Sequence, residues 1–372
     1  MREKILITGG AGFIGSHLAD ELLRHGYSVR ALDCLVPQVH GPARQRPAYL
    51  HPDVDLQVGD VRDPAAVREA LEGVGAVFHF AARVGVGQSM YQIADYCRTN
   101  TEGTAVLLEA LAARPVRRLV VASSMSIYGE GLYRAADGTP VPGVDRPLAQ
   151  LQARDWELRD GRGTILSPVP TPESKPPSLA SVYALSKYDQ ERLSLIVGRA
   201  YRIPTVALRF FNVYGPRQAL SNPYTGVLAI FASRLLAGQA PQIFEDGGQQ
   251  RDFVHVADIA QACRLALERE SAVDQVLNIG SGQQRTVLQV AASLALALGR
   301  TRVEPEVTER YRAGDIRHCF ADLSLARRVL GFKPQMDFAT GLRDLAGWLE
   351  GQISVARVHG ASAELSVRGL TV

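Results

Sequence analysis

Short apolar runs alternate with amphipathic stretches through the first two hundred residues of the chain. The runs that we interpret as strands are 4–8, 28–32, 54–58, 76–80, 118–122 and 205–210. They do not alternate polar and apolar residues, which is typical of parallel strands covered on both faces. Helical spacing of apolar residues lies between them, at 16–25, 64–72, about 100–113 and 183–200. This order predicts the α/β class, with a doubly wound parallel sheet of the Rossmann type.

The rhythm changes after the fifth predicted strand. Residues 131–180 are rich in Pro and Gly and show little periodicity outside 148–158, which indicates an ordered surface excursion rather than a separate domain. We expect a first domain over 1–202 that contains this excursion. Residues 203–350 then supply the sixth strand and a smaller, mixed α/β C-terminal lobe, and the weakly patterned tail 351–372 is expected to be mobile.

Composition is that of an ordinary globular protein. The chain has 372 residues, 46% of them hydrophobic and 21% charged, with a net charge of +3. This length can bury a full core and a smaller lobe. Because no run of Lys and Arg stands out, we expect no nucleic-acid partner. No apolar run reaches the roughly 18 residues of a membrane span and no signal peptide precedes the first strand, so we expect a cytoplasmic protein that does not bind membranes.

Four cysteines are spread along the chain without a paired spacing. Cys34, Cys97, Cys263 and Cys319 form no CxxC pattern. We therefore expect free buried thiols in a reducing compartment, rather than a disulfide or a metal site.

A glycine-rich turn joins the first strand to the first helix. Gly9, Gly12 and Gly15 have the spacing G-x-x-G-x-x-G, with Phe13 and Ile14 at the start of the helix. Glycine permits the tight turn, close approach of the backbone to phosphate, and close packing of helix on strand. The sequence therefore predicts that a dinucleotide pyrophosphate binds here.

Further cofactor contacts are expected at the ends of the next strands. Asp33 lies 18 residues beyond the last of these glycines. A carboxylate there can accept both ribose hydroxyls of NAD and would repel the 2′-phosphate of NADP, so we predict NAD as the cofactor. Asp60 and Val61 are placed to flank the adenine, and Ala81 and Ala82 follow the fourth strand.

A tyrosine and a lysine lie one helical turn apart in the segment 181–187. Tyr183 and Lys187 share one helix face. Tyrosine has an unperturbed pKa near 10, and a nearby ammonium can bring it towards the working range. Ser124 follows the fifth strand and can hold a substrate oxygen, with Ser123 and Ser126 as competitors. Beside a nicotinamide, these groups can move a hydride and a proton on a secondary alcohol.

Together with Asn100 and the segment 209–216, these motifs resemble the extended short-chain dehydrogenase/reductase family, and within it the nucleotide-sugar epimerases and dehydratases. The resemblance covers about residues 1–347. It implies bound NAD and a C-terminal lobe that closes over a nucleotide sugar. It places Asn100 near the cofactor, where a purely structural role is the alternative. It also implies a homodimer that pairs the helices at about 100–113 and 183–200.

The resemblance also assigns residues to the substrate. Asn212 matches the family Asn that binds the sugar-phosphate region, and Arg251 and Arg312 match arginines that grip the diphosphate. Planar guanidinium groups suit such bidentate binding. His79 and His255 stand next to apolar residues and are expected in the core or behind the site rather than as ligands.

The residues after Ser124 separate the reaction types. Family dehydratases carry an Asp-Glu pair there and the decarboxylases a Glu, whereas this chain has Met125 and Ser126, which do not relay protons at neutral pH. The sequence therefore predicts a 4-epimerase, in which Tyr183 moves the proton and NAD the hydride without net redox change. A 4,6-dehydratase, a 4-ketoreductase and a non-catalytic NAD-sensing module are the alternatives.

The sugar is less well defined by the sequence. The excursion, with segments 37–41 and 128–131, resembles a subgroup that includes dTDP-L-rhamnose 4-epimerases. Members often carry a Cys-Pro-x-Cys element in this insert, but residues 156–163 hold no cysteine. The expected substrate is therefore a dTDP- or UDP-linked hexose or 6-deoxyhexose.

Overall fold

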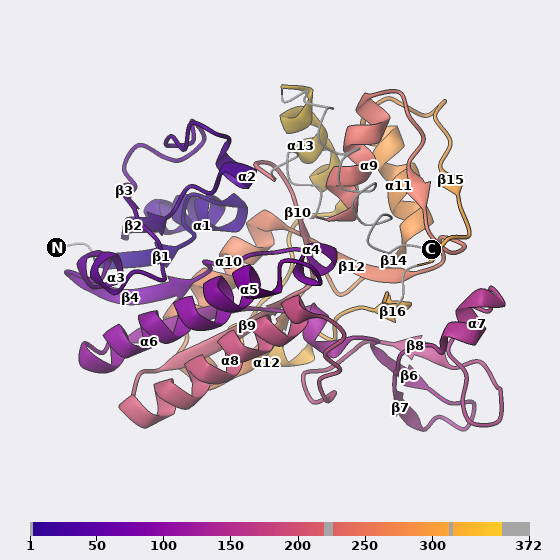
Figure 1. The fold of residues 1–372 in the computed structure, drawn as a ribbon, viewed down its shortest axis with the longest axis horizontal. Coiled ribbons are helices and arrows are strands. Elements are labelled where there is room, and N and C mark those ends of the chain that lie inside the picture. Colours follow the sequence, from indigo (N-terminus) through magenta and orange to yellow (C-terminus); the bar gives the residue numbers. More distant parts are fainter. Residues whose placement is uncertain (1–2, 219–225, 312–314, 352–372) are drawn as a thin grey trace.

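A seven-stranded parallel sheet forms the centre of the molecule (Figure 1). The computed structural model describes residues 3–218, 226–311 and 315–351. The strand order is β13-β9-β5-β4-β1-β2-β3. These strands are β1 (Lys4–Thr8), β2 (Ser28–Asp33), β3 (Asp55–Val58), β4 (Val74–His79), β5 (Arg118–Ser124), β9 (Thr205–Phe210) and β13 (Val276–Ile279). The predicted Rossmann-type fold is confirmed, and β13 is a seventh strand that the sequence analysis did not identify.

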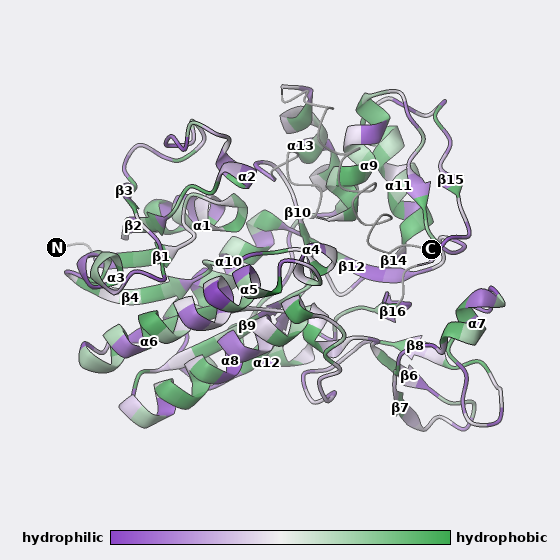
Figure 2. Ribbon diagram, in the orientation of Figure 1, coloured by the Kyte–Doolittle hydropathy of each residue, from purple (hydrophilic) through white to green (hydrophobic). Residues whose placement is uncertain are grey.

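Helices cover both faces of this sheet, as its unbroken apolar runs require. Ile5 and Ile7 of β1 belong to one buried cluster and Leu6 to another, because successive side chains point to opposite faces. One face carries α1 (Phe13–Arg24), α10 (Val256–Glu268) and α12 (Ser324–Leu330). The other carries α3 (Pro64–Ala70), α6 (Gly103–Ala113) and α8 (Val182–Tyr201). In Figure 2 α6 and α8 show polar and apolar residues side by side, as amphipathic covering helices do.

A smaller sheet and three helices form the lobe above the carboxyl ends of these strands (Figure 1). The elements of the lobe are β10 (Asn212–Tyr214), α9 (Val227–Leu236), β11 (Gln242–Ile243), β12 (Gln250–His255), β14 (Gln284–Thr286), α11 (Val287–Ala297), β15 (Glu306–Val307), β16 (His318–Cys319) and α13 (Phe338–Glu350). Phe231, Leu294 and Leu342 belong to its separate apolar core. Residues 203–350 therefore contribute both to this lobe and, through β13, α10 and α12, to the central sheet and its cover.

The excursion at 131–180 has its own small sheet. Its elements are β6 (Leu132–Arg134), β7 (Pro140–Pro142), α7 (Leu148–Gln152) and β8 (Ser167–Val169), with β6 antiparallel to both other strands. Tyr133, Leu158 and Leu166 form a minor apolar cluster inside it. The remaining short elements are α2 (Pro37–His40), α4 (Val86–Ser89), α5 (Ile93–Tyr96), the π-helix Cys97–Glu102, and the 3₁₀ turns Met125–Tyr128 and Glu270–Ala272.

Buried ion pairs fasten the excursion to the lobe. Arg146 lies 2.7 Å from Glu245, and both side chains are almost fully buried. Arg317, equally buried, bonds to Glu157 at 2.5 Å and to Glu245 at 3.0 Å. Since each charge has an opposite partner, the seam tolerates its burial. The excursion is therefore anchored to the lobe and not loosely attached to the surface.

All four cysteines are free thiols. Cys263 and Cys319 are buried, as expected, whereas Cys34 is half-buried and Cys97 is exposed. The expectation of burial is wrong for Cys97, because it begins the π-helix on the surface. In the described ranges, His, Cys, Asp and Glu side chains form no cluster of three or more that could hold a metal. None of the described helices is long and apolar enough to cross a membrane. The expected mobile tail lies, apart from Gly351, outside the described residues.

Candidate active site

The glycine turn leaves no room for side chains. Gly9 has φ +73°, and a Cβ there would lie 2.9 Å from the backbone nitrogen of Ala81. A Cβ on Gly15 would overlap the carbonyl oxygen of Gly9. Gly10, which the sequence analysis did not single out, is equally constrained, because its Cβ would lie 2.6 Å from that of Ala31. The turn therefore brings the start of α1 close to β1, β2 and β4.

The first turn of α1 presents free backbone donors. Gly12 is the N-cap and contributes no side chain, and the first turn holds no acidic residue. The N–H groups at Phe13 and Ile14 belong to the donors that a helix leaves unpaired at its start. Such a helix end favours a phosphate anion. This cradle fits the pyrophosphate of a dinucleotide.

Asp33 lies at the end of β2, next to the glycine turn. Its carboxylate accepts the N–H of Ala11 at 3.1 Å and the N–H of Leu35 at 2.9 Å. The sequence analysis missed His40, whose buried ring lies 3.7 Å from the same carboxylate. Tyr49, also missed, donates to the carbonyl oxygen of Ala11 at 2.9 Å. Asp33 thus braces the turn, and its remaining lone pairs are available to a ribose.

The other predicted cofactor residues surround this turn at different depths. The Asp60 carboxylate pairs with Arg62 at 2.6 Å, and this hydrogen bond lowers the pKa of Asp60. Val61 is buried. The backbone N–H of Ala81 donates to Thr8 at 3.1 Å, and Ala82 follows it in the chain.

Asn100 is fully buried and has structural partners. Its amide oxygen accepts the N–H of Arg83 at 2.7 Å, and its amide nitrogen donates to the Arg83 carbonyl at 3.0 Å. The same nitrogen donates to Ser186 on α8 at 2.9 Å. Asn100 therefore ties the loop after β4 to the helix that carries the tyrosine and lysine.

Tyr183, Ser124 and Lys187 come together at the carboxyl end of β5. Ser181 caps α8 by accepting the N–H of Ala184 at 3.1 Å, which places Tyr183 in the first turn. The hydroxyl of Ser124 faces that of Tyr183 and acts to lower the pKa of the phenol. Lys187 is buried one turn further along. This arrangement can hold an alcohol oxygen and accept its proton.

The pKa of Tyr183 differs from the sequence prediction. Burial raises it above its ordinary value, and the Ser124 hydroxyl offsets part of this rise. Burial also lowers the pKa of Lys187 to about 7, with an opposing effect from Glu191. In this structure, therefore, the phenol is protonated at neutral pH, and ionising it depends on the charges that face it.

The competing serines have other partners. Ser123 donates to the Glu191 carboxylate at 2.6 Å. Ser126 donates through its hydroxyl to Ser124 at 2.9 Å. Met125 is buried and carries no ionisable group. Ser124 is therefore the serine that faces the tyrosine.

The predicted substrate residues lie at the lobe. The side-chain oxygen of Asn212 is buried without a hydrogen-bond partner among the residues that the structure describes. Arg251 donates to the carbonyl oxygens of Gln250 at 2.9 Å, Arg317 at 3.0 Å, and Ile316. Arg312 lies outside the described residues.

His79 and His255 are both buried, as expected of core histidines. Thr8 and Thr104 flank the ring of His79, each at 2.8 Å. His255 caps α10 by accepting the N–H of Ala257 at 3.3 Å.

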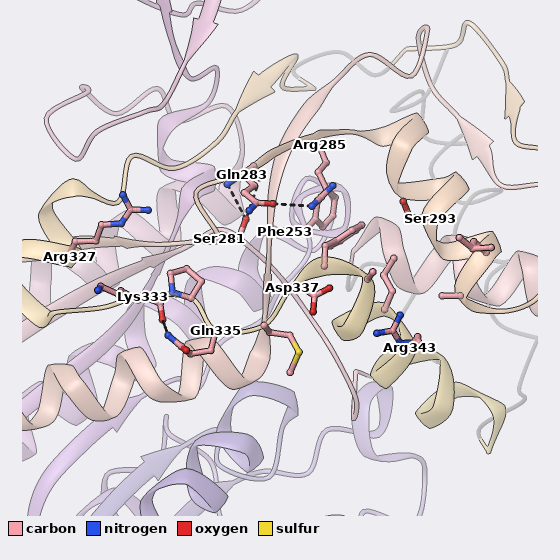
Figure 3. A pocket seen from close by; sticks show the side chains of 17 residues that line it. Phe253, Ser281, Gln283, Arg285, Ser293, Arg327, Lys333, Gln335, Asp337 and Arg343 are labelled. Atoms are coloured by element: carbon pink, nitrogen blue, oxygen red, sulfur yellow. Dashed lines mark hydrogen bonds between the residues drawn. The ribbon is translucent and has the colours of Figure 1, made fainter.

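A cavity of about 950 Å³ lies elsewhere in the lobe (Figure 3). Its wall includes Phe253, Arg285 and Phe338, and α13 borders it. It contains none of the predicted site residues, so the candidate active site lies outside it.

Comparison with known proteins agrees with this geometry. The family model described as "NAD dependent epimerase/dehydratase family" matches residues 5–146 and 162–280. These ranges make up more than half of the chain, which therefore belongs to the NAD dependent epimerase/dehydratase family. The Rossmann-type sheet, the dinucleotide cradle and the Ser-Tyr-Lys site agree with this membership. NAD is the cofactor of this family.

Individual relatives are similar over nearly the whole chain. A dTDP-L-rhamnose 4-epimerase of Burkholderia thailandensis is 36% identical over 351 residues, covering 93% of this chain and 95% of the relative. The crystal structure of a UDP-glucose 4-epimerase with UDP-glucose from Thermotoga maritima has a TM-score of 0.75 and 29% identity, covering 94% of this chain and all of that one. A structure of MoeE5 in complex with UDP-glucose and NAD has a TM-score of 0.74 and 30% identity, with coverage of 94% and 100%.

Proposed function

We propose that this protein is an NAD-dependent nucleotide-sugar 4-epimerase. The observation that carries the proposal is the Ser124 hydroxyl facing that of Tyr183, with Lys187 one turn further on and the dinucleotide cradle at the same edge of the sheet. Ligands of doubly wound folds bind at this carboxyl edge.

The proposed chemistry oxidises the sugar alcohol to a ketone and then reduces the ketone again, with the same side chains acting in both steps. When bound, NAD would accept the hydride from the sugar carbon and, once reduced, would give it back to the opposite face of that carbon. Tyr183 takes the proton of the sugar hydroxyl, Ser124 holds its oxygen, and the ammonium of Lys187 stabilises the phenolate. After the 4-keto sugar has turned, Tyr183 returns the proton. The reaction is then an inversion at C4 without net redox change.

The alternatives lack support in the site. A 4,6-dehydratase needs an acid and a base to eliminate water, and Met125 supplies neither while the Ser126 hydroxyl is bonded to Ser124. A 4-ketoreductase would exchange its cofactor during turnover and usually prefer NADPH, which the carboxylate of Asp33 opposes. A non-catalytic NAD-sensing module would not need the paired hydroxyls of Ser124 and Tyr183.

For the substrate we propose a dTDP- or UDP-linked hexose or 6-deoxyhexose. The buried side-chain oxygen of Asn212, which has no hydrogen-bond partner among the described residues, supports a polar ligand at the base of the lobe. Arg251 and Arg312 remain proposed contacts of the diphosphate. The relative from Burkholderia thailandensis, named a dTDP-L-rhamnose 4-epimerase, favours the dTDP-linked sugar.

We further propose a cytoplasmic homodimer. On α8, Leu185 is 47% exposed and Ile196 is 57% exposed. Eleven residues separate them, which is three helical turns, so they lie on one face. Exposed apolar side chains on one helix face favour a partner helix.

The test is to incubate the purified protein, without added cofactor, with dTDP-L-rhamnose and with UDP-glucose. Products are resolved by NMR while the near-ultraviolet absorbance of NADH is followed. We expect a C4-inverted product at unchanged absorbance. Tyr183→Phe should abolish turnover with NAD binding intact, and Tyr188→Phe, on the same helix, should not. A requirement for added reduced cofactor would overturn the proposal in favour of the ketoreductase.

A further inference from the structure

The buried ammonium of Lys187 is held by an amide. Its Nζ donates to Oε1 of Gln190 at 2.5 Å, and the two residues are 3% and 0% exposed. A buried ammonium more commonly has a carboxylate partner. The nearby carboxylate of Glu191 is instead bonded to Arg209 at 2.7 Å and to Ser123 at 2.6 Å. Within the described part of the chain, the hydrogen-bond partner of Lys187 is therefore neutral.

The amide of Gln190 can take only one orientation. Its Nε2 donates to Oγ1 of Thr104 at 3.0 Å and to the carbonyl oxygen of Ala81 at 3.3 Å. A flipped amide would place its oxygen against the Ala81 carbonyl and its N–H groups against the ammonium of Lys187. Gln190 therefore presents its oxygen to Lys187 and its nitrogen to the wall beside the glycine turn.

Hydrogen-bond counting fixes the tautomer of the neighbouring histidine. Oγ1 of Thr8 accepts the N–H groups of Phe80 at 3.2 Å and Ala81 at 3.1 Å, so its own hydrogen points to Nδ1 of His79 at 2.8 Å. Nε2 of His79 then carries the hydrogen and donates to Thr104 at 2.8 Å. Nε2 of Gln190 lies 3.1 Å from this nitrogen, but both are donors, so Gln190 directs its hydrogens to Thr104 and Ala81 instead. None of these partners carries a charge.

We propose that Gln190 is a positioning residue for Lys187, holding its ammonium by a neutral hydrogen bond so that its charge stays available to the Tyr183 phenolate. This inference rests on the proposed roles of Tyr183 and Lys187. A carboxylate in this place would hold the lysine equally well but would cancel its charge.

The titratable groups around the lysine agree with this role. Burial and the charge of Lys187 lower the pKa of His79 to about 3, so the histidine stays neutral. Lys187 itself has a pKa lowered to about 7 by burial, and that of Tyr183 is raised. On α8 the acidic neighbour is Glu191, whose charge is met by Arg209 of β9. The active form, with Lys187 charged and Tyr183 ionised, has lost one proton from the pair. The lower limb of the kcat profile therefore reports the first proton loss of the pair, whose pH is set mainly by the lowered pKa of Lys187.

Two substitutions at this position should move that limb in opposite directions. Gln190→Met removes the acceptor, which should shift the lower limb down by about one pH unit and lower the plateau of kcat about tenfold, with KM unchanged. Gln190→Glu restores an acceptor but adds a counter-charge, which should shift the limb to higher pH. The matched control is Gln289→Glu, at the exposed N3 position of the α11 capping box, where Glu serves as well as Gln.

The experiment measures kcat and KM across pH for the purified protein and the three variants, with melting temperatures alongside. If Gln190 only fills space, both of its variants will lower the melting temperature and leave the limb where it is, and the proposal fails. The proposal also fails if the lower limb moves in the same direction in Gln190→Met and in Gln190→Glu. Should Tyr183→Phe remain fully active, the assigned base is wrong, and that result is separate from the outcome at Gln190.

Discussion

The Ser123 hydroxyl donates a 2.6 Å hydrogen bond to the Glu191 carboxylate. The same carboxylate holds the Arg209 guanidinium at 2.7 Å. The next residue, Ser124, is bonded to Ser126 and faces Tyr183 instead. Of these two neighbouring serines of β5, Ser123 therefore bonds to a buried ion pair and Ser124 belongs to the candidate site. The sequence Ser-Ser alone does not show this difference in role.

Exchanging each serine for alanine should separate these roles. We expect Ser124→Ala to lower kcat about tenfold to a hundredfold with little change in melting temperature, because a positioned hydroxyl is lost from the reacting oxygen. Ser123→Ala removes a donor from a buried carboxylate and should cost about 1–3 kcal/mol of stability while the folded protein keeps its kcat. Steady-state kinetics and thermal unfolding of both variants check this. The reverse pattern would assign the catalytic hydroxyl to Ser123.

Asp33 should decide between NAD and NADP. In Asp33→Asn the charge that repels a 2′-phosphate is gone, and one of the N–H groups of Ala11 and Leu35 loses its acceptor. We expect NAD to bind about tenfold more weakly, which is about 1.4 kcal/mol, and NADP binding to become measurable. Calorimetric titration of both cofactors gives the two affinities. Asp53→Asn, an exposed change in the loop before β3, should alter neither, and an unchanged preference in Asp33→Asn would contradict the assignment.

The site could be predicted from the sequence where its parts are local. The glycine turn, Asp33 and the Tyr183–Lys187 pair each depend on spacing within one strand, turn or helix, so their residue types indicate their places. The amide of Gln190 could not be predicted, because its orientation depends on Thr104 and Ala81 from two other elements.

The pKa of Tyr183 was not predictable for a similar reason. The spacing to Lys187 predicts a lowered value, but burial by the surrounding elements raises it. β13 was missed because its four residues lie among the short elements of the lobe. Only its parallel pairing with β9 identifies it as a strand of the central sheet. The seam of the excursion joins Arg146 to Glu245 across 99 residues, a distance that no local pattern encodes.

That seam should contribute measurably to stability. Arg146 also donates to the carbonyl oxygens of Trp156 at 3.0 Å and Asp315 at 3.1 Å, so Arg146→Ala leaves several buried acceptors short of a donor. We expect a loss of about 3 kcal/mol in the free energy of unfolding. Arg154→Ala breaks an exposed pair with Glu309 and should cost less than about 1 kcal/mol. Denaturant unfolding compares the two, and equal losses would show that the seam is not a stabilising contact.

His79 should make the fold sensitive to acid. Its pKa is lowered from 6.5 to about 3 by burial, so between these values the unfolded chain binds a proton that the folded chain does not. A lowered folded pKa means that the stability is complete above pH 6.5 and is lost as pH falls towards 3, at about 1.4 kcal/mol per pH unit. His79→Gln carries no titrating ring, so it should be less stable at neutral pH but show a flatter decline. His17, whose pKa is lowered to about 4, remains in the variant, so part of the slope should persist. Free energies of unfolding measured at several pH values between 3 and 7 give both curves, and parallel curves would mean that the pKa of His79 is the same in the folded and the unfolded chain.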